Sequence, residues 1–124
     1  METEMTKTDI QNMMQRVKGA SALDGALLAE ASDALRRVFP SLPVRSQPAL
    51  EPVEAVLHLI DMALPGWSIQ MTGKATAPDG HWRCSLRETR GSDEIEIVGL
   101  GTGPVVALAL LEALIDVALQ KLQR

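Results

Sequence analysis

Residues 93–124 read DEIEIVGLGTGPVVALALLEALIDVALQKLQR, and this stretch decides the fold. Its first residues alternate acidic and apolar side chains up to Val98, which is typical of a strand with one buried face. The segment Gly99–Gly103 predicts a tight turn, since glycine tolerates strained backbone conformations. The run from Val105 to Leu122 is apolar almost all round, so we expect a helix that is covered on more than one side.

Three segments upstream complete the architecture. Residues 67–72 and 81–87 alternate apolar and polar side chains and predict two further strands, and residues 51–64 carry the spacing of an amphipathic helix. The order from residue 51 is therefore helix, three strands, helix. We predict an α+β fold, a two-layer sandwich in which two helices cover one face of a three-stranded antiparallel sheet.

The N-terminal third predicts a helical arm. Thr8 is placed to cap a first helix, and Ser21 with Asp24 resembles a capping box that opens a second. Prolines are concentrated in residues 40–50, which suits a semi-rigid connector. We therefore divide the chain into an arm (1–39), a connector (40–50) and an α-β-β-β-α domain (51–124).

Two resemblances follow from these segments. The helix–three strands–helix order resembles the double-stranded RNA-binding domain. Four patterns, in this order along the chain, resemble the phage ABA sandwich domain, a family of small phage and prophage proteins: MQRVKGA with DGAL (residues 14–20 and 24–27), ALPGW (63–67), PDGHW (78–82), and a glycine-rich turn, Pro104 and ALALLEAL (107–114). This second resemblance implies a phage or prophage origin and no known activity.

Charge and composition exclude several classes of function. The chain has 12 basic and 16 acidic residues, and the excess of acids falls after residue 50. Phosphate binding needs Lys and Arg, and the predicted start of the last helix, residues 102–106, has neither, so we expect no double-stranded RNA partner. A single cysteine, Cys84, favours a reducing cytoplasm. The apolar run that ends before Glu112 is too short for a membrane span, so we expect no membrane partner.

No catalytic, cofactor or metal site emerges from the sequence. The segment Gly99–Gly103 offers backbone N–H groups to an anion, but it has no accompanying lysine and no parallel βαβ context, so a tight connection is the favoured interpretation. His81 and Cys84 are three residues apart on a predicted strand and point to opposite faces, and His58 suits a solvated helix position. We therefore expect no cofactor and no metal.

Two candidate surfaces remain. The exposed face of the predicted sheet carries Lys74, Arg83 and Arg87, which would suit single-stranded nucleic acid or a small anion. A surplus of apolar residues marks a second surface, for which we expect a role in dimerisation or other protein contacts: Met13, Met14, Val17, Leu108, Ile115 and Leu119. The arm either folds back over the last helix within one chain or reaches another subunit, and the sequence leaves both arrangements open.

Three function hypotheses follow in order of preference. The first is a non-enzymatic phage-type accessory protein that acts through protein–protein contacts and self-associates. The second is a binder of single-stranded nucleic acid or of a small anion. The third is an enzyme of unknown type.

Overall fold

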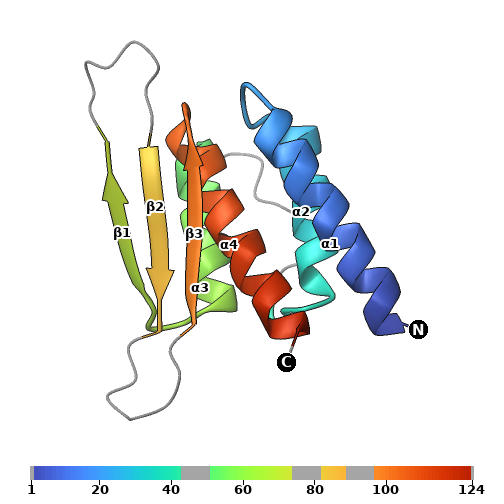
Figure 1. Ribbon diagram of the computed structural model, residues 1–124. Helices are drawn as coiled ribbons and strands as arrows, with labels where there is room; N and C mark the ends of the chain where they lie inside the picture. The colour runs from blue at the N-terminus through green and yellow to red at the C-terminus, as the bar shows by residue number, and fades with distance from the viewer. Residues whose placement is uncertain (1, 43–50, 74–81, 89–96, 124) are drawn as a thin grey trace.

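The computed structural model describes residues 2–42, 51–73, 82–88 and 97–123. They form four helices and three strands: α1 (Glu2–Gly19), α2 (Gly25–Arg36), α3 (Pro52–Ala63), β1 (Ser68–Thr72), β2 (Trp82–Arg87), β3 (Val98–Gly103) and α4 (Val106–Leu122). The strands make one antiparallel sheet in the order β1-β2-β3. This confirms the α+β class and the helix–three strands–helix order (Figure 1).

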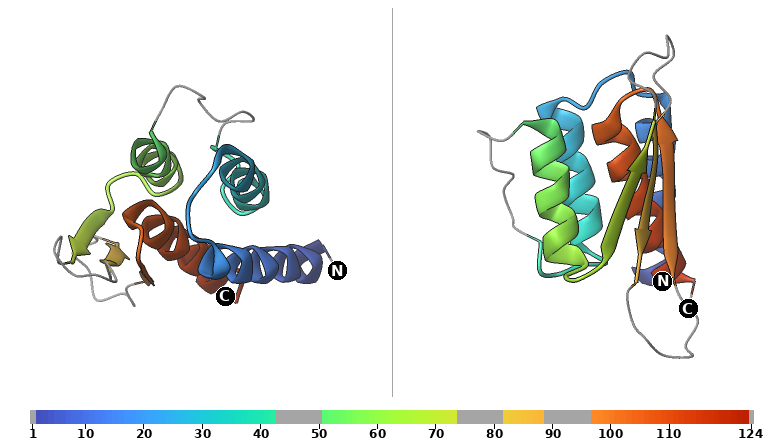
Figure 2. Two further views of the ribbon diagram at one scale, coloured as in Figure 1. Left: turned by 90° about the horizontal axis from the view of Figure 1, so that it is seen from above. Right: turned by 90° about the vertical axis from the view of Figure 1, so that its left-hand side faces the viewer.

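Helix α4 is the centre of the molecule. It packs against β3 and β2 on one side and against α1 on the other, with α3 alongside (Figure 2). Every residue from Ala107 to Ile115 is buried, as expected for a helix that is apolar nearly all round. One continuous cluster of buried side chains runs from Ile10 in α1 to Ala118 in α4, so the arm and the sheet share a core.

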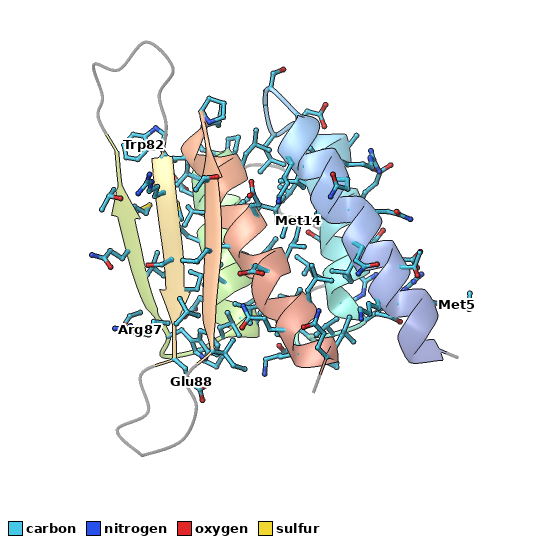
Figure 3. All side chains as sticks on the ribbon, viewed as in Figure 1. Met5, Met14, Trp82, Arg87 and Glu88 are labelled. Atoms are coloured by element: carbon cyan, nitrogen blue, oxygen red, sulfur yellow. The ribbon has the colours of Figure 1, made fainter. Side chains whose placement is uncertain are left out.

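The arm packs on its own chain in this structure. Helix α1 lies along α4, and Met14 points from α1 toward α4 (Figure 3). Helix α2 begins after Asp24, whose side chain accepts a hydrogen bond of 2.8 Å from the backbone N–H of Leu27. The predicted start points were wrong at both helices: α1 begins at Glu2 rather than near Thr8, and the N-cap of α2 is Asp24 rather than Ser21.

The predicted glycine-rich turn is a strand. Residues 98–103 form β3, paired with β2 throughout, while residues 93–96 of the predicted strand lie outside the described residues. Gly99 and Gly101 sit on the face of β3 that rests on α4, where an added Cβ at Gly101 would lie 2.0 Å from the carbonyl oxygen of Ala109. These glycines let the strand backbone lie directly on the helix.

Candidate functional site

The open edge of β3 is capped by polar side chains of α4. The carboxylate of Asp116 accepts a hydrogen bond of 2.9 Å from the backbone N–H of Leu100. The side-chain amide of Gln120 donates to the carbonyl oxygen of Val98 at 2.7 Å and to Asp116 at 3.2 Å. An unpaired strand edge is a template for another strand, so these contacts close this side of the sheet.

Glu112 extends the same row by one turn of α4. Its carboxylate accepts a hydrogen bond from the backbone N–H of Thr102, the next outward-facing residue of β3. Burial raises the pKa of this carboxyl; the Thr102 bond and the charge of Lys18 oppose the rise, and Asp116 adds to it. The three polar residues therefore recur every four positions, which places them on one face of α4 and along one strand.

The hydrogen bonds of β3 also determine which backbone groups of β1 point away from the sheet, at its opposite edge. Alternate residues of an antiparallel strand direct their backbone groups to the same side. Val98, Leu100 and Thr102 bond outward to α4. The alternate residues Gly99, Gly101 and Gly103 therefore bond to β2, at its positions 86, 84 and 82. Positions 83, 85 and 87 of β2 therefore bond to β1, at Thr72, Gln70 and Ser68.

Ile69 and Met71 are the residues of β1 that remain. Their backbone N–H and C=O groups point to the open side of the sheet, and no described residue bonds to them. Strand β1 is the outer strand on the side away from α1 and α2 (Figure 1), and the right-hand view of Figure 2 looks at the molecule from this side. The β1 edge, defined as residues 68–72, thus has no capping of the kind found on β3 from any described part of the chain.

The side chains of the β1 edge are exposed on both faces. All five residues of β1 are exposed, including Ile69 at 38% and Met71 at 44% of their full surface. These two lie on the helix side of the sheet, opposite Leu86 and Cys84 of β2, but α4 packs on β2 and β3 rather than on β1. Half-exposed apolar side chains beside backbone groups with no described partner make this edge the candidate interaction site.

The face of the sheet away from the helices carries two of the predicted basic residues. Arg83 and Arg87 are both exposed there, beside Thr72, Ser68 and the half-buried Ser85. Arg87 lies at the end of β2 near Glu88 (Figure 3). Lys74, the third member of the predicted binding set, lies outside the described residues. Among the residues of this face that the structure describes there is no aromatic side chain, because Trp82 lies on the helix side across Gly73.

The residues for which we expected a role in protein contacts are largely inside the molecule. Met13, Met14 and Val17 are buried where α1 meets the rest of the chain, and Leu108 and Ile115 are buried in α4; Leu119 is half-buried. The structure therefore shows the first of the two arrangements that the sequence left open. The apolar surplus that suggested a dimer is covered by the chain's own arm.

The His and Cys residues that we considered as metal ligands are not brought together in the described part of the chain. No group of three or more His, Cys, Asp or Glu side chains there is placed to hold a metal ion. Cys84 is buried, and burial, followed by the nearby Glu112, raises the pKa of its thiol to about 11. His58 is exposed on α3, and His81 lies outside the described residues.

A shallow groove of about 300 Å³ lies between α1 and α2. Its charged side chains are joined in ion pairs, Arg16 with Glu30 and Arg37 with Asp9, and all four are well exposed. Asp33, also in the groove, pairs with Arg36 at 2.9 Å. Such pairs are typical of a solvated helix–helix surface and leave no unpaired charge here to bind a ligand.

Comparison with family models, with curated proteins and with solved structures found no match. Within the described residues, the structure contains no helix with the length and hydropathy needed to cross a membrane.

Proposed function

We propose that this chain is a non-enzymatic accessory protein of phage or prophage type, located in the cytoplasm, that acts through protein–protein contacts made at the β1 edge. The observation that carries the proposal is the difference between the two edges of the sheet. One edge is closed by Asp116, Gln120 and Glu112, whereas the backbone groups of Ile69 and Met71 have no bonding partner among the described residues.

Strand addition is the recognition mode that such an edge supports. An extended segment of another protein would take up the outward N–H and C=O groups of Ile69 and Met71, and its side chains would cover the two half-exposed apolar side chains. Strand β1 contains no charge and no proline, the residues with which exposed edges are usually protected. The phage-type assignment is supported by the sequence patterns quoted above.

Site-specific photo-cross-linking tests the proposal. A photoreactive amino acid replaces Gln70 in β1 or, as a matched control, Leu100 in β3, which is 60% exposed on the same face of the sheet. In cells of the organism that encodes the chain, we expect a covalent protein adduct from position 70 and none from position 100. Absence of an adduct at position 70, or equal adducts at both positions, would contradict the proposal.

A second candidate is binding of single-stranded nucleic acid or a small anion at the sheet face. Arg83 and Arg87 share that face, and no described residue on it is acidic. A mobility-shift assay at low salt with the wild-type chain and with Arg83→Ala tests this candidate. A shift that depends on Arg83 supports it, and no shift at high protein concentration excludes it.

A further inference from the structure

We propose that the partner at the β1 edge is a second copy of this chain, bound by antiparallel pairing of β1 with β1 about a two-fold axis that passes between the two Gln70 residues. The inference rests on the proposed function and specifies its partner. The product is a continuous six-stranded sheet, since each copy contributes three strands.

The backbone of β1 fits this register. With Gln70 opposite Gln70, Ile69 of each copy lies opposite Met71 of the other. These are the two residues whose N–H and C=O groups point outward, and each such pair exchanges two hydrogen bonds. Two symmetric pairs therefore give four hydrogen bonds between the copies. A register shifted by one residue would place inward-bonding residues opposite outward-bonding ones and would form none of them.

The side chains of β1 are self-complementary about Gln70. The strand reads Ser68-Ile69-Gln70-Met71-Thr72, which is polar and apolar in strict alternation and symmetric in kind about its centre. Antiparallel pairing brings Ile69 and Met71 of both copies together on the helix side of the sheet, where each is partly exposed in the single chain. Directly opposed apolar side chains on one face stabilise a pair of strands.

Charge also favours a copy over a charged partner. None of residues 68–72 is charged, so the paired strands place no like charges opposite each other. The nearest described charges on the other face, Arg83 and Arg87, are on β2 in each copy. Arginines of the two copies would be three strand spacings apart, about 14 Å, which exceeds the Debye length of about 8 Å at physiological salt.

The test uses the one residue that the symmetry places opposite itself. Gln70→Lys puts two cations together on the axis, and Gln70→Glu puts two anions there, while a mixture of the two variants restores opposite charges. We expect each variant alone to raise the dimer dissociation constant about fivefold in sedimentation velocity, and the equimolar mixture to return it to the wild-type value or below. The matched controls are Leu100→Lys and Leu100→Glu, for which neither change is expected.

A proline at position 71 tests the backbone bonds separately. Because the N–H of Met71 faces outward, Met71→Pro removes a donor from the intermolecular pairs without removing one from the β1–β2 ladder. We expect Met71→Pro to raise the dissociation constant at least tenfold, and Met71→Leu, which keeps the N–H, to leave it nearly unchanged. Circular dichroism checks that each variant is folded.

The outcomes separate this inference from the proposed function. A strictly monomeric wild-type chain, or a Gln70→Lys and Gln70→Glu mixture that behaves like the single variants, overturns the two-fold pairing. If the chain is monomeric while position 70 still cross-links to a different protein, the inference fails and the proposed function stands. If position 70 cross-links to nothing, both fail.

Discussion

Gly99 and Gly101 determine how closely the sheet approaches its central helix. A Cβ at Gly101 would meet the carbonyl oxygen of Ala109 and the backbone nitrogen of Ala113, at 2.0 and 2.6 Å. Both are backbone atoms of a buried helix and have little freedom to move. The residue type at these positions is thus set by the packing of β3 on α4.

Substitution of these glycines should be costly. We expect Gly101→Ala to lower the free energy of unfolding by about 1–3 kcal/mol, because β3 must move away from α4. Urea denaturation measures the change. Gly103→Ala is the matched control, since no atom lies within 4 Å of the added Cβ, and we expect it to be neutral or slightly stabilising. Equal decreases in the free energy of unfolding for Gly101→Ala and Gly103→Ala would contradict the close-packing explanation.

Glu112 makes stability depend on pH. Its pKa in the folded chain lies above the ordinary value of 4.5, chiefly because the carboxyl is buried. The folded state therefore binds this proton more tightly than the unfolded state, and the contribution of Glu112 to stability falls as pH rises from 4.5 through the folded pKa. The buried charge is a cost at neutral pH that is absent in acid.

Glu112→Gln should reveal this cost. The amide oxygen keeps an acceptor for the N–H of Thr102 and removes the charge. We expect the variant to be more stable than wild type at pH 7, with a difference that shrinks as pH falls and disappears below 4.5. Urea denaturation across this range measures it. A difference that does not depend on pH would show that ionisation of Glu112 is not the cause.

At the level of elements, helix α4 both forms the core and closes one edge of the sheet, with different faces. Its small and apolar residues pack against the sheet and the arm, and its row of polar residues closes the edge of β3. The polar row runs along the edge of β3. Helix α4 therefore determines both how close β3 lies to it and the direction in which β3 runs. Among the residues that the structure describes, no helix closes the edge of β1 in this way.

Removal of one member of the polar row should loosen β3. Asp116→Ala leaves the N–H of Leu100 without its acceptor, and we expect a loss of about 1 kcal/mol in the free energy of unfolding together with faster amide exchange at Leu100. Asp61→Ala, at an exposed position of α3, is the control and should change neither quantity. Unchanged exchange at Leu100 would argue against edge capping by Asp116.

The start of α2 gives a second prediction at this scale. Asp24→Ala removes the acceptor for the N–H of Leu27 and should cost about 1 kcal/mol. Ser21→Ala should cost much less, although the sequence favoured Ser21 as the cap. Thermal or urea denaturation of the two variants distinguishes them. A larger effect at Ser21 than at Asp24 would contradict the observed N-cap.

Elements with a regular apolar period could be predicted from the sequence, and β3 could not. β1, β2 and α3 alternate or repeat with clear spacing, and the structure places them within a residue or two of the predicted bounds. On β3 the positions that face the core are glycines, which carry no hydrophobic signal, so the segment resembled a turn. The close approach of α4 that explains them is a tertiary contact.

The candidate site was missed for a related reason. The polar spacing of Glu112, Asp116 and Gln120 is visible in the sequence, but their partners are backbone groups of a strand edge, which no periodicity encodes. Whether β1 is an edge or a central strand depends on strand order, which the alternation of Ile69 and Met71 does not determine. For Met13 and Met14 the sequence predicts an apolar face but not what covers it, because the docking of α1 on α4 is a tertiary contact.

At the scale of the whole molecule, most of the exposed apolar surface described on the sheet lies on one strand, β1. The arm covers the outer side of α4, α4 covers the edge of β3, and the described exposed hydrophobic residues of the sheet are Ile69, Met71 and Leu100. Two of these three lie on β1, beside backbone groups that have no partner among the described residues. We propose that this edge is where the protein pairs with a second copy of itself.

Residue-resolved amide hydrogen exchange over a range of protein concentrations tests this claim most directly. At low concentration we predict fast exchange at Ile69 and Met71, and slow exchange at Leu100 and Thr102, which α4 holds. As the concentration rises, Ile69 and Met71 should become protected while Leu100 and Thr102 stay unchanged. Protection at Ile69 and Met71 that is already high in dilute solution, or that does not change with concentration, would contradict pairing of this edge with a second copy.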